Sequence, residues 1–203
     1  MLNRIEINQN SDSQGDSLQA GRDININNHY TVDYNIMRFY EEDIKEIILF
    51  FAKISSSINE TDFIDNSSIP IEEKNRINNL SQEYFELIKS KSLPNFNKIQ
   101  SFLSDPKNEH FVELYQTTAD ELQEKILAVR HKVDKFQEIF DLLKTYILER
   151  NRDDKNFIKH RNKIVLFLHF MYYNCDIGFK NWYIKEGILW LNQLNFLILI
   201  IVF

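Results

Sequence analysis

The longest regular pattern of apolar positions in the chain runs from Leu122 to Ile147. Its apolar residues are Leu122, Ile126, Val129, Val133, Phe136, Phe140, Leu143 and Ile147. Steps of four and three residues alternate along the run, which is the heptad spacing of a helix that packs one edge against a partner helix. Thr118 and Glu121 match a capping box ahead of it. The pattern therefore predicts one long helix, whose partner is either another helix of this chain or a second copy, as in a coiled coil.

Apolar residues at helical spacing predict further helices on both sides of this run. They cover residues 40–54, 70–91, 94–105, 157–175 and 182–203. Only four Gly and three Pro occur among the 203 residues, which favours long helices with few tight turns. Residues 35–203 are thus expected to form one mainly α domain, a helical bundle.

The first 34 residues follow a different pattern. Two short segments, 4–9 and 17–27, alternate apolar and polar residues as strands do, with a break at Gly21. Strands this short bury little apolar area alone, so the helical body or other copies of the chain must cover their side chains. The side chains concerned include Leu18, Ile24 and Ile26. Residues 1–34 are therefore predicted to form a small β element for oligomerisation or docking, and a polar, mostly disordered tail is the alternative.

Composition limits the compartment and the partners. A formal net charge of -6 argues against a footprint on duplex DNA. The single cysteine, Cys175, rules out an internal disulfide and favours a reducing compartment, and no apolar leader opens the sequence, so a cytoplasmic protein is expected. The apolar end, residues 196–203, is shorter than the roughly 20 residues of a spanning helix. A buried or partner-covered helix is favoured there, with a membrane tether as the alternative.

The sequence contains no P-loop, GxGxxG or GxSxG pattern, so nucleotide and acyl-transfer chemistry are not supported. An HEPN-like RNase or toxin is the enzyme alternative, built on Arg152 with His160 or Arg161 with His169, although both gaps are too long for that motif. The two histidines point to opposite sides of one helix, and with a single cysteine they do not make a zinc site. We therefore expect no catalytic residue, no metal and no cofactor.

A basic cluster is expected at the solvated start of the helix over residues 157–175. It comprises Lys155, Lys159, His160, Arg161 and Lys163. Its charge suits an acidic partner surface or RNA, but it lacks the interleaved exposed aromatic residues that are typical of nucleic-acid binding. The simplest interpretation is a solvated face.

Two stretches resemble motifs of the bacterial ABC-three-component conflict systems, in which an ATPase of the ABC/SMC type, a middle component and an effector-bearing component work together. Residues 13–27, SQGDSLQAGRDININ, resemble a glycine-punctuated N-terminal motif, and residues 168–180, LHFMYYNCDIGFK, resemble a C-terminal one. The resemblance assigns Gly15, Asp16, Gly21, Arg22 and Asp23 to the first motif, and Tyr173, Cys175, Asp176, Ile177 and Gly178 to the second.

The resemblance implies a domain that links an effector to its partners and is not itself an enzyme. The sequence departs from the pattern because no nuclease, peptidase or TIR domain precedes the first motif, and the apolar end at Phe203 suggests a truncated or frame-altered tail. We expect a non-enzymatic, homo-oligomeric scaffold of an antiviral defence system. Its partners are other subunits, including an ABC-type ATPase and an effector, rather than nucleic acid or a membrane. The expected interaction residues are Gly15, Asp16, Leu18, Gly21, Arg22, Asp23, Ile24, Ile26, Tyr173, Cys175, Asp176 and Gly178.

Overall fold

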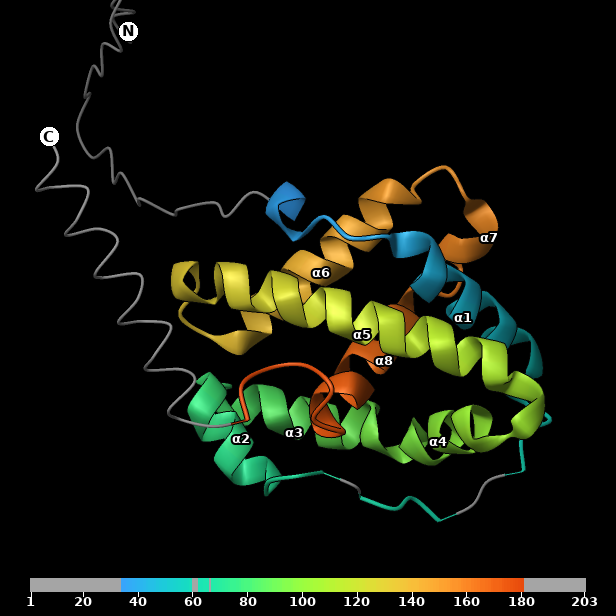
Figure 1. Ribbon diagram of the computed structural model, residues 1–203, viewed down its shortest axis with the longest axis horizontal. Helices are drawn as coiled ribbons and strands as arrows, with labels where there is room; N and C mark the ends of the chain where they lie inside the picture. The colour runs from blue at the N-terminus through green and yellow to red at the C-terminus, as the bar shows by residue number, and fades with distance from the viewer. Residues whose placement is uncertain (1–33, 60–61, 66, 181–203) are drawn as a thin grey trace, which may run out of the picture. The chain divides into compact units, whose positions relative to one another are not determined.

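The computed structural model describes residues 34–59, 62–65 and 67–180, and this part of the chain is mainly helical (Figure 1). Its α-helices are α1 (Glu41–Ile54), α2 (Ile71–Asn78), α3 (Gln82–Lys91), α4 (Phe96–Ser104), α5 (Glu109–Val129), α6 (Phe136–Arg150), α7 (Lys155–Ile158) and α8 (Arg161–Tyr173). The 3-10 turn η1 (Tyr34–Met37) precedes α1, and three others lie between helices, namely η2 (Leu93–Asn95), η3 (Pro106–Asn108) and η4 (Arg130–Lys132).

The prediction of a mainly α fold is confirmed for the described residues. The predicted β element of residues 1–34 lies outside them but for its last residue, and so does the predicted helix over residues 182–203. The division of the chain after residue 34 therefore stays a prediction.

Helix α8 forms the centre of the bundle. It contacts α1, α4 and α6, and in Figure 1 it lies behind α5, with α1 and α6 above it and α3 and α4 below. Every residue from Phe167 to Tyr172 is buried, as expected of a helix that is apolar on most faces. The ring of Phe51 meets Phe167 edge-on at a centroid distance of 5.3 Å, and Phe96 meets Phe170 at 5.4 Å. Edge-to-face contacts of this kind are favourable for aromatic pairs.

The predicted single helix from Leu122 to Ile147 is wrong. Helix α5 ends at Val129, Val133 is extended with φ -121° and ψ 142°, and α6 starts at Phe136. The chain turns back on itself at this corner (Figure 1). All the predicted seam positions are nevertheless buried, because the apolar spacing continues across the corner. The core of the chain itself covers them.

A buried arginine shapes the corner between α5 and α6. The guanidinium of Arg130 donates hydrogen bonds to the carbonyl oxygens of Val133 at 2.5 Å, Asp134 at 3.2 Å and Asn78 at 2.7 Å. Asn78 is the last residue of α2, so its carbonyl has no donor within the helix, and leaving it buried without one would be costly. The heptad pattern placed Arg130 on the solvated face, whereas the structure buries it. These hydrogen bonds stabilise the corner between α5 and α6.

The predicted capping box is also wrong. Helix α5 begins at Glu109, so Thr118 is buried inside the helix and not at its start. The carboxylate of Glu121 accepts a hydrogen bond from the backbone N–H of Tyr40 at 3.0 Å. Glu121 thereby holds the chain just before α1 against α5.

The helix predicted over residues 70–91 is divided in two. Asn79 has a left-handed backbone with φ 53°, which ends α2, and asparagine tolerates this conformation better than most residues. Ser81 then caps α3 by accepting a hydrogen bond from the backbone N–H of Tyr84 at 3.3 Å. The break lets α2 and α3 take different directions beneath α8.

Replacing Arg130 by methionine should lower the free energy of unfolding by about 2–4 kcal/mol, because the buried carbonyl oxygens of Val133 and Asn78 lose their donor. Lys132→Met is the matched control, since Lys132 is exposed on the same turn, and its effect should stay within about 0.5 kcal/mol. Urea unfolding followed by circular dichroism measures both. Equal midpoints for the two variants would show that the corner does not depend on Arg130.

Candidate functional site at the C-terminal motif

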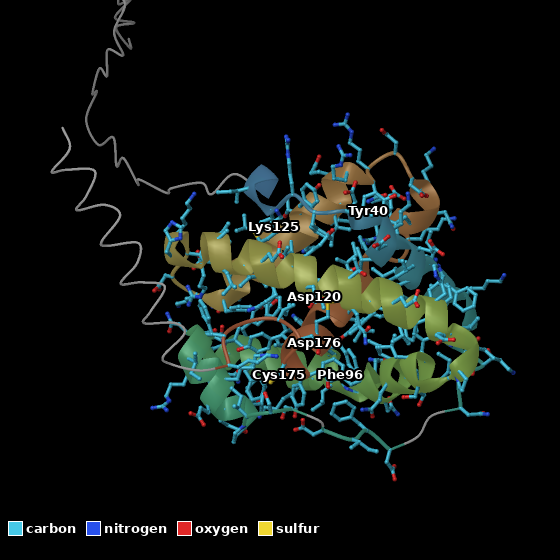
Figure 2. The ribbon with its side chains drawn as sticks, viewed as in Figure 1. Tyr40, Phe96, Asp120, Lys125, Cys175 and Asp176 are labelled. Atoms are coloured by element: carbon cyan, nitrogen blue, oxygen red, sulfur yellow. The ribbon has the colours of Figure 1, made fainter. Side chains whose placement is uncertain are left out.

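The C-terminal motif forms a turn that closes the bundle after α8. Residues 174–180 leave the helix, and Figure 2 shows Cys175 and Asp176 next to each other in this turn. Cys175 has a left-handed backbone with φ 65°, as Gly178 does with φ 89°. Asp176 and Ile177 donate backbone hydrogen bonds to the carbonyl oxygen of Met171 at 2.8 and 3.3 Å. The end of α8 thus curls back onto its own last turn.

Gly178 lies where a side chain would be crowded and the backbone strained. A Cβ atom at this position would lie 3.2 Å from the ring of Tyr172 and 3.3 Å from both Asn78 Oδ1 and the ring of Phe136. The left-handed backbone adds a second reason for glycine. The glycine of the motif therefore serves close packing of the turn on α2 and α6.

Lys74 of α2 is fully buried beneath this turn. Its Nζ donates hydrogen bonds to the carbonyl oxygens of Tyr172 and Ile177, the latter at 2.8 Å, and lies 4.3 Å from the centroid of the Tyr172 ring. Burial lowers the pKa of Lys74 to about 8, and the neighbouring Cys175 raises this pKa and so offsets part of the effect of burial. The amine is therefore mostly charged at neutral pH, and an ammonium suits the negative C-terminal end of a helix.

Two amide side chains pair with the backbone of the turn. Asn78 Nδ2 donates to the carbonyl of Phe179 at 2.8 Å, and Asn78 Oδ1 accepts from the N–H of Phe179 at 2.9 Å. From α5, Gln123 Oε1 accepts from the N–H of Gly178 at 2.7 Å. The polar backbone of the turn is thus satisfied from two helices that lie far away in the sequence.

The carboxylate of Asp176 is also engaged within the chain. It accepts hydrogen bonds from the hydroxyl of Tyr115 at 2.5 Å and from the side-chain amide of Asn174 at 3.1 Å. Burial and the nearby Asp176 charge raise the pKa of Tyr115 far above its usual value, so this tyrosine stays a donor. Asp176 therefore fastens the turn to α5.

Residues 34–178 match C-terminal domain 12 of the ABC-three-component (ABC-3C) systems. The chain belongs to this family. The match runs from η1 to Gly178 and includes the residues of the predicted C-terminal motif, and it confirms the predicted relationship to these systems. Among curated proteins and among solved structures, no match was found.

In this C-terminal domain 12, the predicted interaction residues of the second motif lie at the closing turn. Tyr173 and Asp176 are half-buried, whereas Cys175 and Gly178 are buried. The structure gives these residues contacts within the chain, and their contact with a partner stays a prediction. The predicted interaction residues of the first motif, Gly15, Asp16, Leu18, Gly21, Arg22, Asp23, Ile24 and Ile26, lie outside the described residues.

The sequence alone did not identify the residues that stabilise the closing turn of C-terminal domain 12, which is residues 174–180. Lys74 and Asn78 occur in a polar stretch that resembles a solvated helix. Their spacing was the available signal, because Ile71, Lys74 and Asn78 share one face of α2, and all three are buried. Gln123 carried no comparable signal, since it stands beside the apolar seam of α5.

The histidines of the alternative RNase pattern lie in different surroundings. His169 is in the core, with Nδ1 2.7 Å from Ser92 Oγ and Nε2 3.1 Å from the hydroxyl of Tyr84. His160 lines an open surface pocket. Its candidate partner Arg152 is exposed and lies 3.8 Å from the carboxylate of Asp153.

Two further features bear on site chemistry within the described ranges of C-terminal domain 12. No group of three or more His, Cys, Asp or Glu side chains is arranged to hold a metal ion there. Every helix in the same ranges is too short or too polar to cross a bilayer.

Replacing Lys74 by methionine should lower the free energy of unfolding by about 2–4 kcal/mol, because the buried carbonyl oxygen of Ile177 loses its donor and that of Tyr172 keeps only backbone N–H donors. Glu73→Met introduces the same side chain at an exposed position of α2 and is the control. Amide hydrogen exchange should show lost protection at the end of α8 in the first variant only. Unchanged protection there would contradict the capping role of Lys74.

Acid should destabilise the domain through His169. Burial lowers the pKa of His169 from 6.5 to about 4, so below pH 6.5 the unfolded chain binds more protons than the folded chain. The stabilising contribution is therefore complete above pH 6.5 and is lost as the pH falls toward 4, by roughly 3 kcal/mol in all.

Urea unfolding of the wild type and of His169→Gln at both ends of this pH window measures the effect. The variant cannot take up the proton, so its stability should fall less than that of the wild type. His131→Gln, at an exposed histidine, should keep the wild-type slope. Parallel slopes for the wild type and His169→Gln would assign the acid sensitivity to other groups.

Proposed function

We propose that this protein is a non-enzymatic scaffold of a bacterial ABC-three-component defence system, which joins partner subunits through its helical domain and associates with itself through residues 1–34. The family match over residues 34–178 carries the proposal, because it connects the domain to a system of several protein components. The partners on this proposal are an ABC-type ATPase and an effector-bearing subunit.

The proposed lack of enzymatic activity is supported by the burial of His169 and Cys175, two side chains that could otherwise take part in catalysis. His169 is enclosed in the core between Ser92 and Tyr84, where a substrate has no access without local unfolding. The Cys175 thiol is buried beside Lys74. Residues in these positions stabilise a fold, and a domain stabilised in this way suits a component that others bind.

Self-association is supported by the apolar alternation in residues 1–34, which requires cover. The heptad seam gives no support to an intermolecular coiled coil, since its residues are buried in the core of the chain. The N-terminal segment is therefore the part of the chain on which the proposed homo-oligomer depends.

Size-exclusion chromatography with light scattering tests the self-association. The full chain should elute as an oligomer, and the chain without residues 1–34 should elute as a monomer. Circular dichroism should show that the shortened chain keeps the helix content of the helical domain and is therefore folded. If both proteins contained the same number of chains per particle, residues 1–34 would have no role in self-association.

Co-expression of the full chain with the products of the flanking reading frames tests the scaffold role. A stoichiometric complex with an ABC-type ATPase or an effector subunit is expected. A chain that purifies free of these proteins, or that degrades RNA when alone, would contradict the proposal.

A further inference from the structure

The segment from Lys155 to Lys163 carries an unusual concentration of positive charge. Four of its nine residues, Lys155, Lys159, Arg161 and Lys163, are basic and none is acidic, in a chain whose net charge is -6. We call these four residues the α7–α8 basic patch. Within the part of the chain that the structure describes, none of them forms an ion pair.

Two aspartates stand just before the patch in the sequence, and both lie near cations outside the patch; the carboxylate of Asp153 is 3.8 Å from the guanidinium of Arg152. Asp154 precedes α7 and accepts hydrogen bonds from the backbone N–H groups of Asn156 and Phe157, both at 3.0 Å. Its other oxygen lies 3.4 Å from the ammonium of Lys45. The patch therefore keeps its positive charge even though an aspartate adjoins it in the sequence.

The start of α8 adds to this positive potential. The first turn of α8 has no acidic residue, and the residue before it, His160, makes no side-chain cap. By contrast, the first turn of α1 has three acidic residues. Because the N-terminal end of a helix carries partial positive charge, basic residues there are unfavourable unless something negative approaches them.

Lys163 is the most constrained member of the patch. Its ammonium lies 5.1 Å from the centroid of the Phe51 ring. Burial and the nearby charge of Lys98 lower the pKa of Lys163. An amine held half-buried beside another cation would be stabilised by an approaching carboxylate.

An open pocket with an apolar floor adjoins the patch, and His160 belongs to its lining. The pocket has a volume of about 520 Å³. Leu49, Phe50 and Phe111 form its apolar part, with the rings of Phe50 and Phe111 stacked at 4.4 Å. Lys53 adds a further exposed cation to its lining. The volume suits one or two apolar side chains of a bound segment.

We propose that this pocket and the α7–α8 basic patch together form a docking site for a segment of a partner subunit in which an apolar side chain is flanked by carboxylates. The apolar side chain enters the pocket between α1 and α5, and the carboxylates face Lys159, Arg161 and Lys163. This site rests on the proposed scaffold function and specifies the surface that the partner uses.

The observations favour an acidic protein segment over RNA. A nucleic-acid site needs a positive groove that follows several phosphates and exposed rings on which bases stack. Here the cations are confined to one helix start, and Phe50 and Phe111 are half-buried and stack on each other. A pocket for one anchor beside a basic rim is the geometry of peptide recognition.

The binding experiment uses the full chain and the partner subunits from the flanking reading frames. Lys159→Glu/Arg161→Glu reverses part of the patch, and Ala52→Phe fills the pocket, whose lining includes Ala52. Lys91→Glu/Lys132→Glu is the control, with the same charge change at exposed positions of α3 and η4. Biolayer interferometry measures the affinities, and thermal unfolding checks that each variant is folded.

Both site variants should bind the partner about tenfold or more weakly than the wild type, while the control stays within about twofold. Added salt should weaken wild-type binding more than binding of the charge-reversed variant. Overlapping short peptides of the bound partner should identify a segment with an apolar residue between acidic ones.

Partner binding that persists unchanged in both folded site variants would overturn the docking site and leave the scaffold function standing. A single-stranded RNA that binds the wild type but not Lys159→Glu/Arg161→Glu, with partner binding unaffected, would assign the patch to nucleic acid and overturn the docking site. A wild-type chain that binds no partner subunit would overturn the scaffold function and, with it, this site.

Discussion

The hydrogen bonds from the ammonium of Lys74 hold the turn that follows α8 against α2, and the packing of the domain's C-terminal end depends on them. Helix α8 is apolar on most faces and ends inside the protein, so its last carbonyl groups are far from water. Helices commonly end at a left-handed glycine, but here Cys175 takes the left-handed conformation. Lys74 supplies donors to the carbonyls of Tyr172 and Ile177 from another helix. The turn is therefore stabilised by tertiary contacts as well as by its own backbone.

The corner between α5 and α6 is built on the same principle. Arg130 donates to the carbonyl oxygens of Val133 and Asp134 in the link before α6, and to that of Asn78 at the end of α2. The side chain of Asn78 in turn pairs with Phe179 in the closing turn. Helix α2 therefore supplies Lys74 and Asn78 to one junction and a carbonyl to the other. Because buried polar groups are costly when any member loses its partner, these contacts bind three distant segments into one cooperative unit.

This principle explains what the sequence predicted and what it did not. Apolar spacing identified the buried face from Leu122 to Ile147 correctly, since burial follows periodicity whether the helix is continuous or bent. The bend itself depends on Arg130 reaching Asn78, fifty-two residues away, and such contacts leave no periodic trace. The resemblance to ABC-three-component systems was recognisable from the sequence, but the closing of the turn after α8 depends on Lys74, which resembles a solvated residue. The N-terminal element lies outside the described residues.

The cations of the domain are of two kinds: buried ones that stabilise the fold, and exposed ones that are available to a partner. Lys74 and Arg130 are buried and directed at backbone carbonyls of their own chain, so their charge is already compensated by the structure. Lys159 and Arg161 are exposed without an ion pair in the described residues. The whole chain is acidic, with a net charge of -6, yet residues 155–163 contain four basic residues and no acidic one. Exposure to solvent alone does not account for such a concentration of positive charge. The residues of the predicted C-terminal motif stabilise the turn that closes the fold, whereas the exposed cations of the patch, which have no ion pair in the described residues, lie in α7 and at the start of α8, which is why the proposed docking site is placed there.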